Sequence, residues 1–161
     1  MVSKITSKNN FFVLIFLLLL SLHLLLISSR RIYPFIDIPF RLAASTILKY
    51  YGEPNNQFES YYSIKIFLKS NIIHLLFCSL KIFPSVEFAN KIFYCIYIIL
   101  LPLSIFLIIK KLNGNPIFTL FSFLVLYNFN VAWGFSEFTI LYSFSKLLYR
   151  VEAWKCYHTP D

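Results

Sequence analysis

The strongest pattern in the chain is a series of long apolar runs separated by short polar breaks. The first run, Phe11–Ser29, has 19 residues without a formal charge. As a helix it would be about 28 Å long, close to the roughly 30 Å hydrocarbon core of a bilayer. The second run, Ile92–Ile109, has 18 uncharged residues, and a third lies within the uncharged stretch Leu112–Ser136. The pattern predicts three transmembrane helices, at about residues 11–29, 89–110 and 116–133.

The residues that flank the second run are typical of helix ends. Ser85 and Glu87 precede it, where a side-chain cap and a negative charge stabilise a helix N-terminus. Lys110–Lys111 and then Asn113–Gly114 follow it, which is a common C-terminal signature. Pro102 lies in the middle of the run and predicts a kink that neighbouring helices accommodate.

The first run has a second interpretation, a cleaved signal peptide, because Lys4 and Lys8 precede it. However, the run is long for the apolar part of a signal peptide, and no A-x-A cleavage site follows it. We therefore favour an uncleaved membrane anchor. His23 within the run is expected to face other helices and not to act as a ligand.

A shorter apolar run, Ile72–Phe83, has 12 residues and includes Lys81. This length is typical of an interfacial or re-entrant helix. If the run does not cross the membrane, Lys4, Lys8 and Lys110–Lys111 fall on one side, as the excess of basic residues in cytoplasmic loops favours. If it crosses, Lys110–Lys111 falls outside. We expect the first arrangement, a multi-pass protein of the cell membrane with a cytoplasmic N-terminus and an outer loop over residues 30–88.

The outer loop contains a segment with helical periodicity, over about residues 38–51. Its apolar residues form one stripe, and the polar residues Arg41, Ser45 and Lys49 lie off that stripe. Asp37 suits the N-cap of such a helix. We expect amphipathic helices on the membrane surface at about residues 38–51 and 72–83. The stripe consists of Phe40, Ala43, Ala44, Ile47 and Tyr51.

Composition agrees with a membrane protein. Hydrophobic residues make up 58% of the 161 residues and charged residues 14%, whereas soluble domains have about 25% charged residues. The net charge of +8 is scattered along the chain, without a basic patch or nucleic-acid motif, so nucleic acid is not an expected partner. The three cysteines are far apart and form no CxxC motif, which disfavours a zinc site. The expected fold class is all-α, a polytopic transmembrane helical protein with the lipid bilayer as its partner.

Two stretches carry a resemblance to a known family. They are HLLFCSLKIFPSVEFANKIFYCIYIILLPLSIFLIIKKLNG, which begins at His74, and NFNVAWGFSEFTI, which begins at Asn128. Together with an N-terminal span followed by a loop aspartate, they resemble the N-terminal part of polytopic GT-C class membrane glycosyltransferases, of the protein mannosyltransferase and arabinosyltransferase type. The resemblance covers roughly Phe11–Ile140.

The resemblance implies transfer of a sugar from a polyprenyl-phosphate donor at the outer membrane face. In that family an aspartate of the first outer loop activates the acceptor or helps to hold a divalent metal ion, and Asp37 is the matching position. A carboxylate can act as general base for an acceptor hydroxyl, and a cation such as Arg41 can bind the phosphate. The alternative interpretation of Asp37 is an ordinary helix N-cap.

Two departures from the family pattern keep a second function open. Position 41 is arginine where a histidine is expected, and Arg41 is spaced to pair with Asp37 on one helix face. The pattern also decays after Ile140 and leaves a short polar tail at residues 145–161, as in a truncated, inactive fragment. The alternative is a small non-catalytic membrane protein that packs against other membrane helices through residues such as Asn128 and Asn130. A transporter is disfavoured because the spans carry no paired charges.

Overall fold

The computed structural model describes residues 2–29, 35–64 and 72–134, and every regular element in those ranges is a helix. The expected all-α class is therefore confirmed for the part of the chain that is described, and the tail at 145–161 lies outside it. The two long helices are α1 (Val2–Ser29) and α5 (Val86–Lys111). The shorter ones are α2 (Ile38–Lys49), α3 (Phe58–Tyr61), α4 (Ile72–Ser79), the 3-10 helix η1 (Pro116–Val125) and α6 (Phe129–Trp133).

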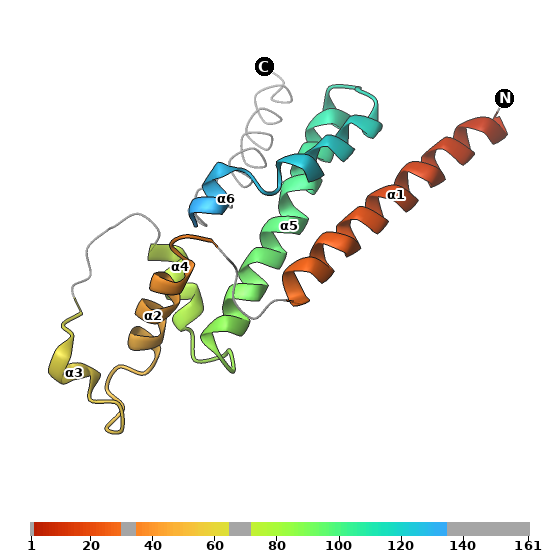
Figure 1. Cartoon of the computed structure of the whole chain (residues 1–161). Helices are drawn as coiled ribbons and strands as arrows, with labels where there is room; N and C mark the ends of the chain where they lie inside the picture. Colours follow the sequence, from red (N-terminus) through yellow and green to blue (C-terminus); the bar gives the residue numbers. More distant parts are fainter. Residues whose placement is uncertain (1, 30–34, 65–71, 135–161) are drawn as a thin grey trace, which may run out of the picture.

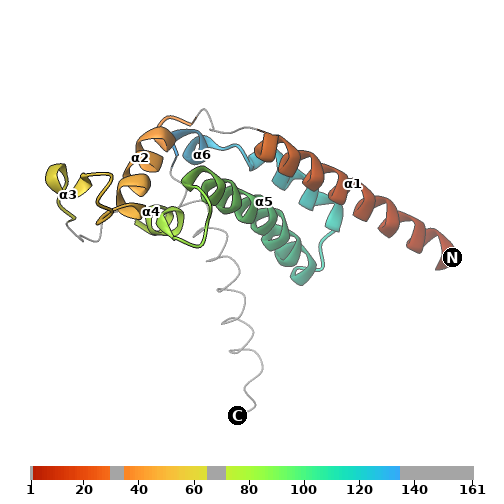
Figure 2. The same cartoon turned by 90° about the horizontal axis from the view of Figure 1, so that it is seen from below.

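The two long helices lie side by side and run in opposite directions, with η1 packed against both (Figure 1, Figure 2). The end of α1 meets the beginning of α5, where the ammonium of Lys91 donates a hydrogen bond to the carbonyl of Ser28 at 2.9 Å. Helices α2 and α4 gather at this end (Figure 1). The basic end of α5 lies at the opposite end, and there the first turns of α1 extend away from it (Figure 1, Figure 2).

Within the described ranges, two helices are long enough and apolar enough to cross a membrane, over Asn10–Ser29 and Val86–Lys111. Helix α4 has 8 residues, so it is about 12 Å long and far shorter than a bilayer core. The expectation that this run does not cross the membrane stays a prediction.

The third expected span, over residues 116–133, is not one continuous helix in the structure. Helix η1 covers its first 10 residues and ends at Val125. The Asn128 side chain then accepts a hydrogen bond from the Val131 amide at 3.1 Å, which starts the short helix α6. An asparagine that caps a new helix favours a break in the old one, and the sequence interpretation missed this local competition.

The predicted ends of α5 are confirmed. The Ser85 hydroxyl accepts a hydrogen bond from the Phe88 amide at 3.1 Å, which is an N-cap. At the other end Asn113 adopts a left-handed conformation (φ +53°), and the Gly114 amide donates to the Ile109 carbonyl at 2.9 Å. The helix continues through Pro102, whose ring is buried.

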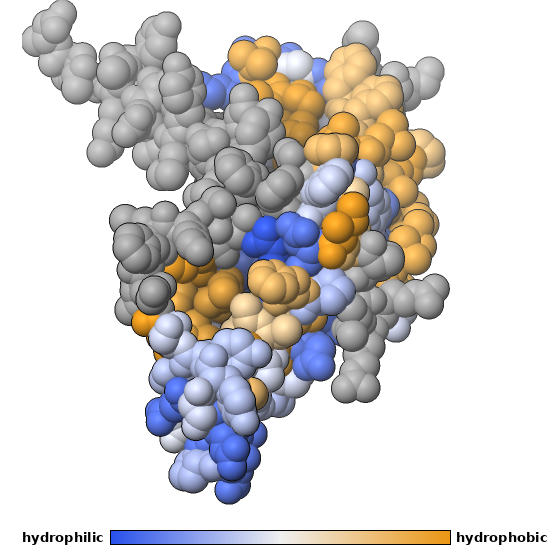
Figure 3. Space-filling view, turned by 60° about the vertical axis from the view of Figure 1, so that its left-hand side comes forward, coloured by the Kyte–Doolittle hydropathy of each residue, from blue (hydrophilic) through white to orange (hydrophobic). Residues whose placement is uncertain are grey.

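Helix α2 packs on the rest of the protein through a face that contains both apolar and polar side chains. The buried side chains are Ile38, Leu42, Ser45 and Lys49, whereas Phe40 of the stripe is 79% exposed. The polar members are satisfied by backbone carbonyls of the α4 region, since the Lys49 ammonium donates to the Phe83 carbonyl at 2.6 Å. Of the stripe residues, two are exposed, Phe40 and Ala43, and three are half-buried, Ala44, Ile47 and Tyr51. Figure 3 shows that polar surface gathers at the lower end of that view and apolar surface at the upper end.

Candidate functional site

The candidate site lies at the N-terminus of α2, where the chain meets α6. The Ile36 amide donates to the Ala132 carbonyl at 3.2 Å, which joins the two segments. Gly134 has a positive φ of +82°, and a Cβ there would lie 3.1 Å from the Cβ of Asp37. Any other residue at position 134 would have a strained backbone, and its Cβ would press on the Asp37 side chain. Glycine therefore allows the end of α6 to approach Asp37 closely.

Asp37 and Arg41 form an ion pair at this point, as their spacing predicts. The Arg41 Nη2 lies 3.3 Å from the Asp37 Oδ2. The Asp37 side chain is 41% exposed, whereas that of Arg41 is 14% exposed. Asp37 occupies the N-cap position of α2, but its side chain makes no capping hydrogen bond. The carboxylate is directed to Arg41 instead, so it is held by a charge and still reaches the surface.

A second set of polar side chains lies at the contact of α4 with α5. The Nε2 of His74 is 2.9 Å from the Oδ1 of Asn90, and both side chains are fully buried. Because an amide oxygen can only accept, the Nε2 carries the proton. The Cys78 thiol, one turn further along α4, lies 3.6 Å from the same nitrogen, and the Phe93 ring meets the imidazole edge to face at 4.7 Å.

Burial determines the charge state of this second group. Burial lowers the pKa of His74 from 6.5 to about 4; the hydrogen bond to Asn90 acts in the opposite direction, and the positive charge of Arg41 lowers it again. His74 is therefore neutral at pH 7. Burial also raises the pKa of the Cys78 thiol to about 12, so the thiol is protonated and unreactive while α4 is in place.

The two groups lie on helices that pack against one another, since α2 contacts α4 and α5, and α4 contacts α5. The sequence interpretation placed Asp37 and Arg41 in the site and missed His74 and Asn90. A signal was present, because His74 and Cys78 are one helical turn apart in an apolar run. A histidine in such a run requires a buried partner, but the sequence alone does not show that Asn90 supplies it.

The divalent metal ion that the resemblance implies does not fit the side chains around Asp37. A hard cation such as Mg²⁺ needs several oxygen ligands, and the Asp37 carboxylate already faces a guanidinium. Within residues 2–29, 35–64 and 72–134, no three His, Cys, Asp or Glu side chains are grouped so that they could hold a metal ion. The pair instead presents a carboxylate that reaches the surface and a guanidinium whose positive charge can attract an anion.

The fold and the site together define an all-helical protein with two long apolar helices and a polar cluster at one end of them. No family model, curated protein or solved structure matches the chain.

Proposed function

We propose that the chain is an integral membrane protein in which α1 and α5 cross the bilayer in opposite directions. Their apolar windows have a mean hydropathy of 2.8, and only 6% of the α1 window is buried inside the protein. A soluble protein would have to leave this apolar helix in water. Lys110 and Lys111 lie at the same end as the start of α1, so a cytoplasmic N-terminus satisfies the preference for basic residues inside.

We further propose that the Asp37–Arg41 pair is the reactive part of a GT-C-like glycosyltransferase site at the outer membrane face. The observation that carries this proposal is the asymmetry of the pair, with a partly exposed carboxylate beside a mostly buried guanidinium. Phe40, next to the pair in the sequence, is 79% exposed, and an exposed aromatic ring suits a membrane surface. A donor embedded in the bilayer would reach the site from that direction.

In the proposed reaction, the negative charge of Asp37 and the positive charge of Arg41 have separate roles. The Asp37 carboxylate accepts the proton of an acceptor hydroxyl as the hydroxyl oxygen forms a bond to the anomeric carbon of the sugar. The bond between that carbon and the phosphate oxygen breaks, and its electron pair leaves with the polyprenyl phosphate. The positive charge of Arg41 stabilises the negative charge on this leaving group.

Sugar transfer by the purified chain in lipid nanodiscs tests this function, with polyprenyl-phosphate sugars as donors and labelled product as readout. We expect Asp37→Asn to lower the rate at least a hundredfold, in keeping with the loss of a general base. Glu59→Gln is the matched control, since it removes one carboxylate from the same loop at an exposed position outside the pair. Equal rates for Asp37→Asn and the unaltered chain would exclude Asp37 from the reaction.

The exposed apolar surface supports a second candidate, a non-catalytic subunit that packs against other membrane helices. Leu14, Leu18 and Leu25 of α1 are each more than half exposed, and so are Phe121 and Leu124 of η1. Purification in a mild detergent separates the two candidates. A larger complex that survives purification, without transfer activity, supports the subunit, and an active chain without partners supports the enzyme.

A further inference from the structure

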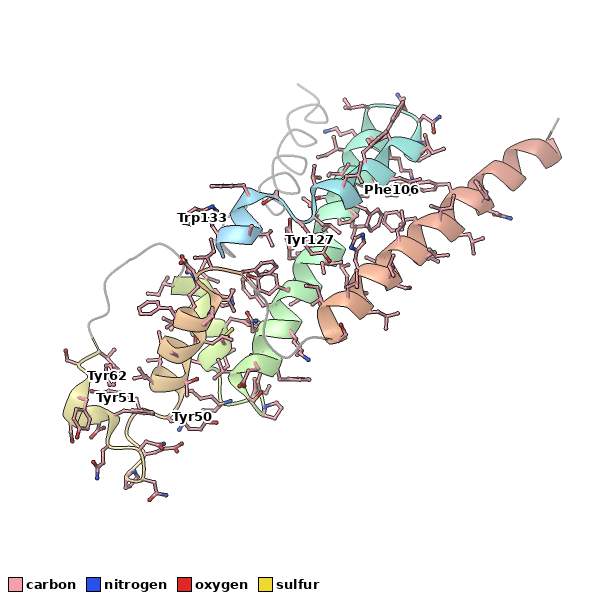
Figure 4. The ribbon with its side chains drawn as sticks, in the orientation of Figure 1. Tyr50, Tyr51, Tyr62, Phe106, Tyr127 and Trp133 are labelled. Atoms are coloured by element: carbon pink, nitrogen blue, oxygen red, sulfur yellow. The ribbon has the colours of Figure 1, made fainter. Side chains whose placement is uncertain are left out.

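A cavity of about 470 Å³ lies between the N-terminal half of α1 and the C-terminal end of α5. It is at the opposite end of the long helices from Asp37, so it is separate from the site described above. Phe12 and Val13 of α1 and Phe106 of α5 form its apolar wall, and Lys110, Asn113 and Gly114 form its polar side. Figure 4 shows Phe106 on the side of α5 that faces α1.

The wall and the polar side are both fixed by local structure. The rings of Phe12 and Phe106 stack with centroids 6.1 Å apart and an angle of 17° between their planes, which joins the two helices. The turn after α5 is tight, and a Cβ on Gly114 would lie 3.2 Å from the side chain of Ile109. Glycine therefore allows this close turn after α5, and Gly114 lines the cavity together with Lys110.

Among the residues that the structure describes, the charge at this end of the long helices is positive. Lys110 and Lys111 end α5, and α1 contains Lys4 and Lys8 before the cavity. No aspartate or glutamate occurs in residues 2–29 or 88–134 of the sequence. An ammonium at the boundary of an apolar helix and water, beside an aromatic wall, is complementary to a ligand with an anionic head and an apolar tail.

We propose that this cavity binds an anionic phospholipid, with the phosphate on the Lys110 ammonium and an acyl chain along Phe12 and Phe106. The cavity accommodates a headgroup, and the acyl chains would extend along the exposed faces of α1 and α5 into the bilayer. The apolar wall favours a lipid over free phosphate, which would gain nothing from the aromatic rings. The proposal rests on the membrane insertion proposed above and is independent of sugar transfer.

Native mass spectrometry of the full chain, released from nanodiscs that contain phosphatidylglycerol and phosphatidylcholine in equal amounts, tests the proposal. We expect about tenfold preferential retention of phosphatidylglycerol. Lys110→Gln should abolish the preference, whereas the matched control Lys111→Gln, which removes the same charge one residue away and does not line the cavity, should keep it. Equal losses in both variants would show attraction to surface charge only and would overturn the site.

Two further measurements separate the alternatives. Displacement of the lipid by inorganic phosphate would overturn the proposal in favour of a soluble anion, and retention in excess phosphate supports a lipid. Alkaline carbonate extraction of the same membranes reports on insertion. A chain that stays in the membrane but shows no lipid preference overturns the lipid site alone, and a chain that is extracted overturns both the insertion and the site.

Discussion

The two long helices α1 and α5 have the same mean hydropathy of 2.8 but very different surroundings. Only 6% of the apolar window of α1 is buried inside the protein, compared with 39% of that of α5. Helix α5 contacts α1, α2, α4 and η1, so it is the element around which the others are arranged. Hydropathy therefore identifies both helices but does not tell which one organises the fold.

The difference lies in the kinds of residues on their inner faces. Helix α5 buries small and polar side chains, among them Ala89, Asn90 and Ser104, together with Tyr94 and Tyr97. Small residues allow other helices to approach, and polar ones make specific hydrogen bonds. Helix α1 consists largely of leucine in its apolar part, with His23 as its polar contact to the Tyr127 hydroxyl at 3.3 Å. A leucine surface suits lipid contact, since lipid imposes no particular geometry.

The largest expected effect is the loss of stability when a phenylalanine of α5 is replaced by alanine, compared with the same replacement in α1. Phe93 of α5 is 4% exposed and packs on His74 and Phe77, so Phe93→Ala should lower the free energy of unfolding by about 3–5 kcal/mol. Phe11 of α1 is 63% exposed, and Phe11→Ala should cost less than about 0.5 kcal/mol. Unfolding in mixed micelles, followed by circular dichroism, measures both. Similar losses for the two variants would contradict the difference between the helices.

The next effect depends on pH and concerns the contact of α4 with α5. While α4 is packed on α5, the pKa of His74 is about 4. In an opened state, in which α4 has separated from α5 and His74 meets water, the pKa returns to 6.5. The opened state therefore binds more protons between these values, and the free energy of opening falls as the pH drops from about 6.5 to 4. The whole change is at most about 3 kcal/mol, and none is expected above pH 7.

Cys78 reports this opening, because its thiol is fully buried beside His74. Labelling of Cys78, with Cys95 and Cys156 replaced by serine, should accelerate toward pH 4 relative to the denatured chain at the same pH. His74→Gln is the matched variant, as it keeps an N–H donor for Asn90 and cannot titrate. If the variant shows the same acceleration as the parent, the titrating group is not His74.

The all-α class and the ends of α5 could be read from the sequence, because the signals are local. Ser85 at the start and Asn113–Gly114 at the end act within one helical turn, and the structure keeps both. The Asp37–Arg41 pair is local in the same way, because its partners are four positions apart on one helix. The capping role of Asp37 was not realised, because Arg41 competes for the same carboxylate.

The remaining features depend on contacts between distant segments and could not be predicted. The burial of Lys49 requires the Phe83 carbonyl, 34 residues away. The His74–Asn90 bond requires that α4 turns back onto α5. The exposure of Phe40 follows from the packing of the opposite side of α2 on α4. The break in the third apolar run was missed because Asn128 was interpreted as a contact to other helices, whereas its side chain accepts a hydrogen bond at the start of α6.

The smallest expected effect is the loss of one hydrogen bond near η1, which contacts both long helices. It tests which of the two helices holds η1 more strongly. The Tyr97 hydroxyl of α5 is buried and donates to the Leu126 carbonyl at 2.9 Å, in the turn where η1 ends. Tyr97→Phe leaves that buried carbonyl without its donor and should cost about 1 kcal/mol. Tyr127→Phe removes the longer and more exposed contact to His23 of α1 and should cost only a few tenths of a kcal/mol. The same unfolding measurement compares the two variants, and a larger loss for Tyr127→Phe would show that η1 is held by α1 and not by α5.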